Sequence, residues 1–218
     1  MADAWEEPRT DAARLILSLR SAGVTEPRVL AALESVPRDL FVPKIFGDRA
    51  WEDSALPIAC GQTISQPYIV GLMTQTLAVE PRHRVLEVGT GSGYQAAILS
   101  RLARYVYTVE RFRSLLTDAE SRLRVLGISN VITRLGDGGQ GWPEQAPLDR
   151  IRVTAAAPEE PHALLAQLKP KGVLVAPVGR GAVQSLRRYT PDGQGGFKIE
   201  VLTDVRFVPL LEGVAKEG

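Results

Sequence analysis

The sequence contains few of the residues from which covalent cross-links and metal centres are built. Its 218 residues include one cysteine, Cys60, and two histidines, His83 and His162, which stand far apart. One cysteine cannot close an internal disulfide, which excludes a disulfide-stapled scaffold. Two distant histidines and a lone cysteine argue against a zinc site, so we expect no metal. Because no histidine lies near Cys60 in sequence, we interpret it as a small packed residue rather than a nucleophile.

The chain also lacks a strong net charge and a long apolar run. Its 26 Lys and Arg residues nearly balance its 25 Asp and Glu residues, which leaves a net charge of +1 and no electrostatic basis for binding nucleic acid. No uninterrupted apolar stretch approaches the roughly 20 residues needed to cross a membrane. The acidic segment Met1–Glu7 has no apolar core of the kind found in secretory signals. These absences predict a cytoplasmic protein without a nucleic-acid or membrane partner.

What remains is the composition of an ordinary globular protein, with 44% hydrophobic and 23% charged residues. The length suits one domain or one domain with an appendage, and no long linker divides it. We expect residues 1–218 to form a single domain, with an N-terminal helical and irregular extension over about 1–64 and a core over about 65–218. Apolar stripes predict two helices in the extension, with Thr10 and Thr25 as their N-caps, followed by an irregular segment over 37–64.

Beyond residue 65, β-prone runs alternate with helix-prone runs, which favours parallel strands joined by right-handed crossovers. The last two β-prone runs flank the turn-rich segment 191–196, which predicts an antiparallel hairpin at one sheet edge. We predict a Rossmann-like, doubly wound α/β fold: a mostly parallel seven-stranded sheet, helices on both faces, antiparallel C-terminal strands and the N-terminal helical extension. The predicted strands span residues 84–88, 105–110, 131–135, 148–154, 172–178, 185–189 and 197–207, and the predicted core helices span 67–77, 93–103, 112–126 and 161–168.

The most informative segment joins the first of these strands to the helix after it. It reads Val85-Leu86-Glu87-Val88-Gly89-Thr90-Gly91-Ser92-Gly93, with glycine at every second position of the loop. Glycine permits positive φ and removes the Cβ that would block a ligand, and the helix start offers free backbone N–H groups. In an open parallel sheet this turn lies at the carboxyl ends of the strands, where ligands bind. The segment therefore predicts a ligand pocket at that edge.

Two acidic residues follow later strands at the same edge. Glu110 ends the next predicted strand, 21 residues after Gly89, close to the interval of about 20 residues expected for a carboxylate that accepts hydrogen bonds from two ribose hydroxyls. Asp137 follows the third predicted strand within Gly136-Asp137-Gly138, which is equally a turn sequence. Glu110 therefore indicates a ligand that contains a ribose, whereas Asp137 taken alone fits a ligand contact and a simple turn equally well.

The glycine spacing separates two classes of nucleotide-binding enzyme. The dinucleotide fingerprint is G-x-G-x-x-G, whereas this loop reads G-x-G-x-G and lacks the lysine of a phosphate-binding loop. The pattern Glu87-x-Gly89-x-Gly91-x-Gly93 resembles the first motif of class I S-adenosylmethionine methyltransferases. That resemblance implies S-adenosyl-L-methionine as cofactor, S-adenosyl-L-homocysteine as its product, and Asp137 as the acceptor for the adenine amino group.

Further segments resemble one family of these enzymes, the protein-L-isoaspartate (D-aspartate) O-methyltransferases. They are Val36–Pro43, Gly61–Tyr68, Thr154–Pro158 and Val205–Leu210, in the family's order around the glycine loop and the segment Gly136–Pro143. Generic methyltransferases do not share the Thr-Ile-Ser-Gln-Pro part of Gly61–Tyr68, and the resemblance extends from about residue 14 to 211. It implies methyl transfer to the free α-carboxylate of L-isoaspartyl residues in damaged proteins and peptides, which starts repair through a succinimide.

The resemblance also implies which residues form the site. Ser65 is the expected catalytic residue, and because Pro67 favours the first helical position, Gln66 is the expected N-cap and the Ser65 hydroxyl stays free. The expected partners are isoaspartyl peptides and proteins, bound by a monomer. The expected substrate-binding residues are Ser65, Ala155, Ala156, Ala157, Val208 and Pro209, although the alanines fit tight packing after a strand equally well. The expected cofactor-binding residues are Thr63, Ile64, Ser65, Glu87, Gly89, Thr90, Gly91, Ser92, Gly93, Glu110, Arg111, Gly136, Asp137 and Gly138.

Three positions depart from the family's pattern. Ala59 stands where many relatives have glycine, Trp51 replaces a usual tyrosine, and Arg152 lies in a strand segment that is usually apolar. An arginine in a central strand needs a polar partner or an exit to solvent. Arg152 therefore leaves the local packing of that strand open, although not the cofactor site.

Three other functions fit parts of the sequence. A nicotinamide-dependent oxidoreductase shares the glycine loop and Glu110, but the glycine spacing and the absence of a Tyr-x-x-x-Lys pair disfavour it. A methyltransferase for a small molecule or RNA shares the loop but not the Thr63–Pro67 segment. A protein that binds the cofactor without catalysis would keep the loop as well. Methyl transfer to an isoaspartyl peptide, but not to its aspartyl twin, separates these possibilities.

Overall fold

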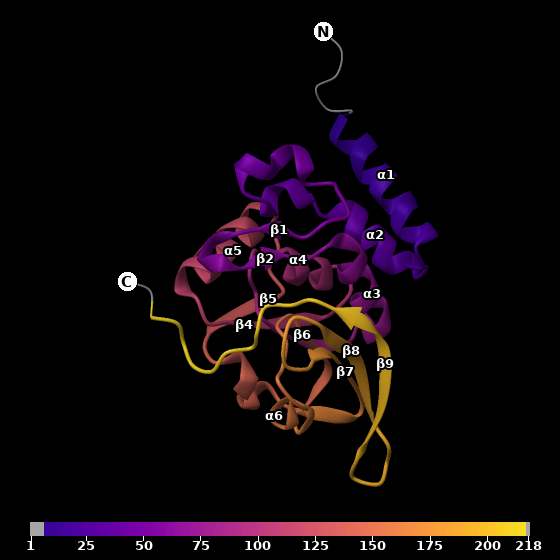
Figure 1. Cartoon of the computed structure of the whole chain (residues 1–218), viewed down its shortest axis with the longest axis vertical. Coiled ribbons are helices and arrows are strands. Elements are labelled where there is room, and N and C mark those ends of the chain that lie inside the picture. Colours follow the sequence, from indigo (N-terminus) through magenta and orange to yellow (C-terminus); the bar gives the residue numbers. More distant parts are fainter. Residues whose placement is uncertain (1–6, 217–218) are drawn as a thin grey trace.

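The computed structural model describes residues 7–216, with side chains from residue 10 onward, as one sheet between two layers of helices (Figure 1). The seven strands lie in the order β5-β4-β3-β6-β7-β8-β9. The first five in this order pair in parallel and the last two are antiparallel. The predicted fold class is confirmed. The strands are β3 (Arg84–Val88), β4 (Tyr105–Glu110), β5 (Val131–Leu135), β6 (Leu148–Val153), β7 (Leu168–Val178), β8 (Gln184–Pro191) and β9 (Phe197–Val205).

The two faces of the sheet bury separate apolar clusters. One face packs against five helices through strand residues such as Val85, Val106 and Val175. The other face, with Leu86, Ile151 and others, is covered by α6 and by short 3-10 turns. Alternate strand residues therefore point to opposite layers, as the pleat requires. The helices are α1 (Glu7–Ser21), α2 (Pro27–Ser35), α3 (Pro67–Leu77), α4 (Tyr94–Ser100), α5 (Arg113–Val125) and α6 (His162–Leu165).

The N-terminal extension contributes to the same core as the sheet. Leu15, Leu19 and Phe41 belong to the cluster that contains Val85 and Val175. The predicted N-caps of its two helices are wrong. Thr10 lies inside α1, and α2 is capped by Glu26, whose carboxylate accepts a hydrogen bond from the Arg28 amide. The backbone amide of Thr25 instead donates to Gln75 Oε1 on α3.

The segment 37–64, predicted to be irregular, contains more structure than expected. It forms 3-10 helices and a small antiparallel ladder of β1 (Leu56–Pro57) and β2 (Thr63–Ile64). Arg38 organises it from the inside, because the fully buried guanidinium donates to the Ala50 and Ser54 carbonyls and stacks 5.0 Å from the Tyr94 ring. These contacts join residues 38–54 to Tyr94, the first residue of α4, directly after the glycine loop.

After β9 the chain crosses back along the carboxyl edge of the sheet, where Figure 1 shows the last residues in yellow. The Ala156 amide donates to the Val208 carbonyl at 2.7 Å, and the Leu210 amide donates to the Ala156 carbonyl at 2.8 Å. The crossing segment thereby covers the strand ends from which the predicted site residues extend. Within residues 7–216, no helix combines the length and the apolar character that a bilayer-spanning helix requires.

Candidate active site

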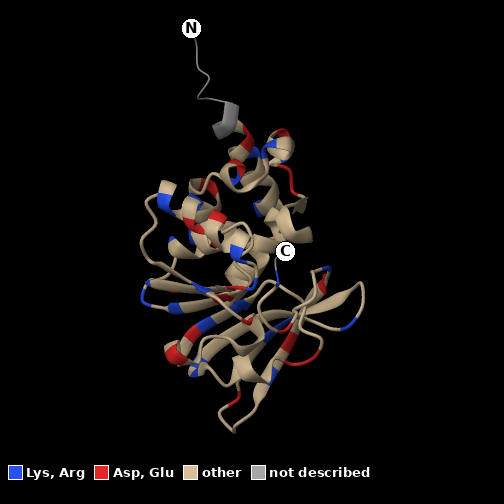
Figure 2. Cartoon of the chain, turned by 90° about the vertical axis from the view of Figure 1, so that its left-hand side faces the viewer, with Lys and Arg blue, Asp and Glu red and all other residues tan. Residues whose placement is uncertain are grey.

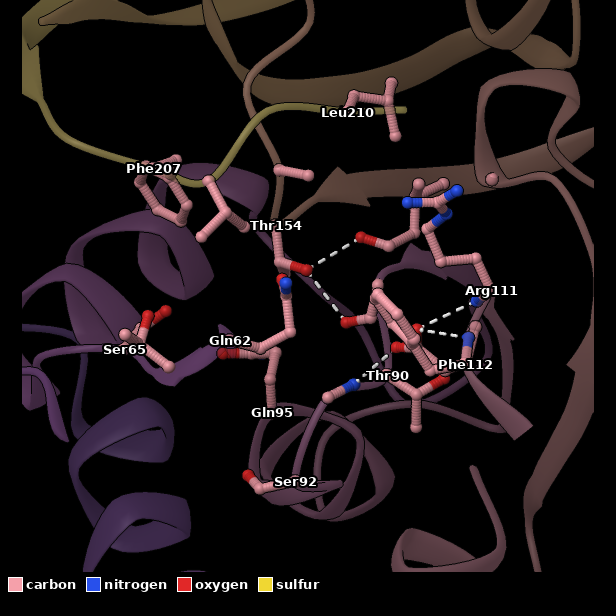
Figure 3. Close-up of a pocket in the computed structure, with 18 of the residues that line it drawn as sticks. Gln62, Ser65, Thr90, Ser92, Gln95, Arg111, Phe112, Thr154, Phe207 and Leu210 are labelled. Carbon is pink, nitrogen blue, oxygen red and sulfur yellow. Dashed lines mark hydrogen bonds between the residues drawn. The ribbon is translucent and has the colours of Figure 1, made fainter. Parts of the chain in front are cut away.

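A cleft of about 900 Å³, counting its open mouth, lies at the carboxyl edge of β3, β4 and β6. Three stretches of chain form its walls: residues 62–65 with the start of α3, the glycine loop 88–92, and the crossing segment 207–211. Figure 3 shows Ser65 on one side of the cleft and Arg111 with Phe112 on the other. The cleft therefore collects side chains from positions more than 100 residues apart in sequence.

Most of the predicted site residues line this cleft, and some do not. Those that line it are Thr63, Ile64, Ser65, Gly89, Thr90, Gly91, Ser92, Glu110, Arg111, Gly138, Ala155, Val208 and Pro209. Those outside its lining are Glu87, Gly93, Gly136, Asp137, Ala156 and Ala157.

The glycine loop holds its shape through Thr154, the first residue after β6. Its hydroxyl oxygen lies 2.7 Å from the Val88 carbonyl and 2.8 Å from the Gly89 carbonyl. Gly89 has φ +93°, and a Cβ at this position would overlap the Thr154 hydroxyl. Only glycine fits both the backbone conformation and the contact. The loop backbone consequently lies open to the cleft.

Glu110 lies at one end of the cleft with its carboxylate tied to the backbone. Its Oε2 accepts from the Gly91 amide at 2.8 Å, and its Oε1 accepts from the Arg111 and Phe112 amides at 2.8 and 3.0 Å. The side chain is buried but still borders the cleft. A carboxylate has about four acceptor directions, so three are used by the protein itself.

Asp137 and Arg111 hold the end of the crossing segment. Asp137 accepts from the Gly139 amide through Oδ1 and from the Gly213 amide through Oδ2, both at 2.8 Å. Arg111 stacks on Phe112 and donates to the Gly213 carbonyl at 3.2 Å, while its own carbonyl accepts from Ala215. These bonds attach residues 210–215, here called the C-terminal strap, to Asp137 and to Arg111, the residue after Glu110.

Ser65 stands between β2 and α3 with its hydroxyl free. Gln66 occupies the N-cap position of α3, as predicted, but its side chain does not cap the helix. Asp53 does so instead: its Oδ1 accepts from the Tyr68 amide at 2.7 Å and its Oδ2 accepts from Gln66 Nε2. Among the residues that the structure describes, the half-buried Ser65 hydroxyl has no hydrogen-bond partner. It can therefore donate to a group in the cleft.

Below the cleft floor, three neighbouring strands contribute polar side chains to one buried row. Glu87 on β3 lies beside Thr108 on β4 and Arg152 on β6 in the strand register. All three are fully buried, and Glu87 Oε2 accepts from the Thr108 hydroxyl at 2.6 Å. Burial raises the pKa of Glu87, and burial lowers the pKa of Arg152. Arg152 finds its polar partners on α3 rather than in solvent, because its Nη1 donates to the Val70 carbonyl and the Thr74 hydroxyl.

The three alanines named as expected substrate-binding residues differ in their access to the cleft. The bonds between Ala156 and residues 208–210 join these two stretches directly, and Ala156 and Ala157 are buried. Ala156 and Ala157 therefore lie outside the lining of the cleft. Ala155, Val208 and Pro209 keep a face on the cleft, whereas Ala156 and Ala157 provide the tight packing that the sequence left as an alternative.

The other departures from the family pattern are accommodated locally. Ala59 is exposed and has no positive φ, whereas the next residue, Cys60, has φ 57°. Trp51 packs partly buried against the main core. Cys60 was predicted to be packed, and this is wrong: it is exposed, with Sγ 3.3 Å from the Ser114 hydroxyl.

Sequence reasoning missed several residues that line the cleft. Thr154 begins the family segment Thr154–Pro158, and Phe112 lies two residues after Glu110, so adjacency to these motifs was a usable signal. Gln95 and Tyr94 follow the glycine loop in the same way. Arg152 was noted as a packing anomaly only, and nothing in its sequence position indicated that it reaches the cleft. Among the described residues, no group of three or more His, Cys, Asp or Glu side chains is placed to hold a metal ion.

Comparison with known proteins places this chain among close relatives. Residues 10–215 match the family described as protein-L-isoaspartate(D-aspartate) O-methyltransferase (PCMT). The protein-L-isoaspartate O-methyltransferase of Caulobacter vibrioides strain NA1000 / CB15N is 68% identical over 98% of this chain and 96% of that protein. A solved protein-L-isoaspartate O-methyltransferase is 30% identical with a TM-score of 0.81, over 91% of this chain and 65% of that one. A Plasmodium falciparum structure assigned to the same enzymes, in complex with S-adenosyl-L-homocysteine, is 26% identical with a TM-score of 0.80, over 91% and 97%.

Proposed function

The chain belongs to the protein-L-isoaspartate(D-aspartate) O-methyltransferase family, and from this premise we propose how its residues share the work of methyl transfer. The enzyme is an S-adenosylmethionine-dependent carboxyl O-methyltransferase. It methylates the free α-carboxylate of L-isoaspartyl residues in damaged proteins and peptides. The ester then closes to a succinimide, and hydrolysis of the succinimide converts a fraction of the damaged residues to normal aspartate.

The cleft fits the cofactor on three observations. The loop backbone at Gly89 and Gly91 is bare, Glu110 offers carboxylate oxygens at one end, and Phe112 adds an aromatic face there. When bound, S-adenosylmethionine supplies a methyl group made electrophilic by the sulfonium. The loop amides and Glu110 would hold its nucleoside, with Thr63, Ile64, Thr90, Ser92, Arg111 and Gly138 around it.

Glu110 and Asp137 carry different parts of that binding. Glu110 has about one acceptor direction left, so a ribose hydroxyl uses it or competes with the Gly91 amide. Asp137 lies outside the lining of the cleft and both its oxygens accept from backbone amides. We propose that Asp137 accepts a hydrogen bond from the adenine amino group only after its bond to the C-terminal strap breaks. Gly93, Gly136 and Glu87 would support the pocket without lining it.

Ser65 is proposed as the residue that aims the substrate. The isoaspartyl carboxylate is already ionised at neutral pH, so attack needs no general base. Catalysis then depends on placing the attacking oxygen in line with the methyl carbon and sulfur. The free Ser65 hydroxyl donates one hydrogen bond that fixes the carboxylate, and a stronger interaction would weaken the nucleophile. Ala155, Val208 and Pro209 would border the peptide on the opposite wall.

The partners follow from this site. Basic and acidic residues are mixed along the chain rather than gathered on one side (Figure 2), which suits varied peptides better than a polyanion. We also propose that residues 1–218 act as one methyltransferase domain, supported by the core that the extension shares with the sheet. A monomer in the cytoplasm stays a prediction from the sequence.

The observation that carries this assignment is the cleft itself, which brings the free Ser65 hydroxyl to the glycine loop and the 207–211 segment. The test is transfer of labelled methyl groups to an isoaspartyl peptide and to its aspartyl twin. We expect base-labile label on the isoaspartyl peptide alone. Equal label on both peptides, or none on either, contradicts the assignment.

A further inference from the structure

Arg152 is a fully buried cation that borders the cleft. Its Nη1 donates to the Val70 carbonyl at 3.1 Å and to the Thr74 hydroxyl at 2.9 Å, both on α3. Its Nε and Nη2 have no hydrogen-bond partner within residues 7–216. These bonds anchor one side of the guanidinium and leave its other N–H groups for an acceptor.

The acceptor is not Glu87, although the two residues are neighbours in register. The described residues include no ion pair between them, and Glu87 Oε2 is bonded to Thr108 while its Oε1 is unpartnered. A buried charge without a bonded partner is strongly unfavourable. The charge of Glu87 therefore acts on Arg152 without a hydrogen bond between them. The Nε and Nη2 groups still lack an acceptor, and the cleft that Arg152 borders is where one can enter.

Gln95, on α4, borders the cleft next to this arginine. The Thr74 hydroxyl donates to the Val70 carbonyl at 2.6 Å, so its oxygen can only accept from its other neighbours. Gln95 must then offer its Nε2 to Thr74, at 3.3 Å, which leaves its buried Oε1 unpartnered. In the view of Figure 3 the Gln95 side chain lies between Ser65 and Phe112. The cleft floor thus presents unused donors beside an unused acceptor.

This combination matches a zwitterion, a carboxylate next to an ammonium group. The nucleoside end of the cleft is at Glu110 and Phe112, so an elongated ligand that starts there reaches Gln95 and Arg152 with its far end. S-adenosylmethionine carries an α-amino acid at that end. We propose that Arg152 binds the carboxylate of the cofactor's amino-acid end and that Gln95 Oε1 accepts from its ammonium group. This inference rests on the proposed function and names a residue that determines cofactor specificity.

The test compares ligands with and without the amino acid. Arg152→Met keeps a long apolar side chain in the buried position, and calorimetry measures the affinity for S-adenosylhomocysteine and for 5′-methylthioadenosine, which has no amino-acid end. We expect affinity for S-adenosylhomocysteine to fall about tenfold or more, with affinity for 5′-methylthioadenosine unchanged. Arg152→Lys, which keeps the charge but not the fork of donors, should give an intermediate loss.

Arg150→Met is the matched control. Arg150 lies on the same strand and the same face, is buried, and donates through Nε and Nη1 to the carbonyls of Ala78, Asp149 and Lys171, away from the cleft. Its replacement should leave the ratio of the two affinities as in the wild type. If the ratio of S-adenosylhomocysteine affinity to 5′-methylthioadenosine affinity falls equally in Arg152→Met and Arg150→Met, the proposal is overturned. Such a result would show an effect of strand packing rather than a lost contact with the ligand.

The remaining outcomes are also decisive. If Arg152→Met leaves both ligand affinities unchanged but raises the KM for the isoaspartyl peptide, the anion is the substrate's carboxylate and the cofactor assignment is overturned. If affinities and KM all stay within twofold, Arg152 binds no carboxylate. If Arg152→Met does not fold, the Arg152→Lys variant decides by the same ratio. Failure of the wild type to bind S-adenosylhomocysteine would instead contradict the proposed function.

Discussion

The two ends of the cleft differ in how far the protein satisfies its own polar groups. At the Glu110 end, the carboxylate accepts three backbone amides and Asp137 accepts two. At the Arg152 end, polar atoms of Arg152, Gln95 and Glu87 have no partner within the described chain. An unsatisfied buried polar atom costs about 1–3 kcal/mol. At the Glu110 end a ligand must replace hydrogen bonds that already exist. At the Arg152 end each new hydrogen bond removes the free-energy cost of an unsatisfied buried atom.

This difference predicts a division of labour. The Glu110 end shapes the site before any ligand arrives, and the Arg152 end discriminates between ligands that have an amino acid and ligands that lack one. The glycine loop lies between the two ends, and its Gly91 amide donates to Glu110.

Gly89→Ala should have the largest effect, because it removes the surface shared by both ends. The new Cβ would overlap the Thr154 hydroxyl at a φ that alanine avoids. We expect S-adenosylhomocysteine binding to fall on the order of 100-fold or more, about 3 kcal/mol, when measured by calorimetry. Gly47→Ala, at an open position without positive φ, should bind normally. Wild-type affinity in Gly89→Ala would mean that the loop is not the shared surface.

Ser65→Ala tests whether the catalytic group is separate from both binding ends. Turnover of an isoaspartyl peptide should fall on the order of 100-fold, the size of effect expected from a misplaced reactant, with cofactor affinity within twofold. Ser35→Ala, which removes a hydroxyl bonded to the Ala32 carbonyl of its own helix, is the control. A large loss of cofactor affinity with normal turnover would contradict the assigned role.

Glu110→Ala tests the Glu110 end of the cleft, where the protein satisfies its own polar groups. Removing the carboxylate frees three backbone amides and deletes the ribose acceptor, so we expect about tenfold weaker binding of both S-adenosylhomocysteine and 5′-methylthioadenosine. The equal loss is the signature of this end, in contrast to the selective loss expected at Arg152. Glu120→Ala on α5, whose carboxylate accepts from Thr133, controls for removal of a carboxylate. Unchanged affinity in calorimetry would refute the ribose role.

The smallest expected effect is a pH dependence from the buried row. Burial raises the pKa of Glu87 to about 8 from 4.5, so the folded state holds a proton that the unfolded state has lost between these values. Stability from this group is full below pH 4.5 and is lost as the pH rises through 8. Between pH 6 and 7 the wild type should lose on the order of 1 kcal/mol more than Glu87→Gln in urea denaturation. Parallel slopes for the two proteins would show that Glu87 does not titrate in this range.

Much of the sheet could be predicted because its signals are local. The runs 84–88, 105–110 and 131–135 are β-prone and end at turn residues, and the structure has these same bounds. The caps of α2 and α3 could not be predicted in the same way. At α2 the Thr25 amide donates to Gln75 on α3, and the adjacent residue Glu26 caps the helix instead. At α3 the side-chain cap is Asp53, which lies 15 residues from the amide it accepts.

The site shows the same limit. The glycine loop and Glu110 could be located at the cleft because each follows or ends a strand at one edge of the sheet. Ser65 was located by the family resemblance of its segment. The bonds from Ala156 to residues 208–210 and from Asp137 to Gly213 link segments more than 50 residues apart, and no periodicity reports them. Arg152 keeps unpartnered donors because α3 offers acceptors to its Nη1 only. That arrangement depends on how α3 packs against β6.

The C-terminal strap also bears on how the enzyme should be handled in the laboratory. Ala215 is hydrogen-bonded to Arg111, so an affinity tag or fluorescent label attached after the last residue would begin within a few residues of the binding cleft. Such a fusion should slow exchange of spent cofactor for fresh cofactor, whereas the same tag placed ahead of α1 should not. The turnover rates of the two fusions therefore measure how strongly the C-terminal strap limits entry and release of cofactor at the cleft.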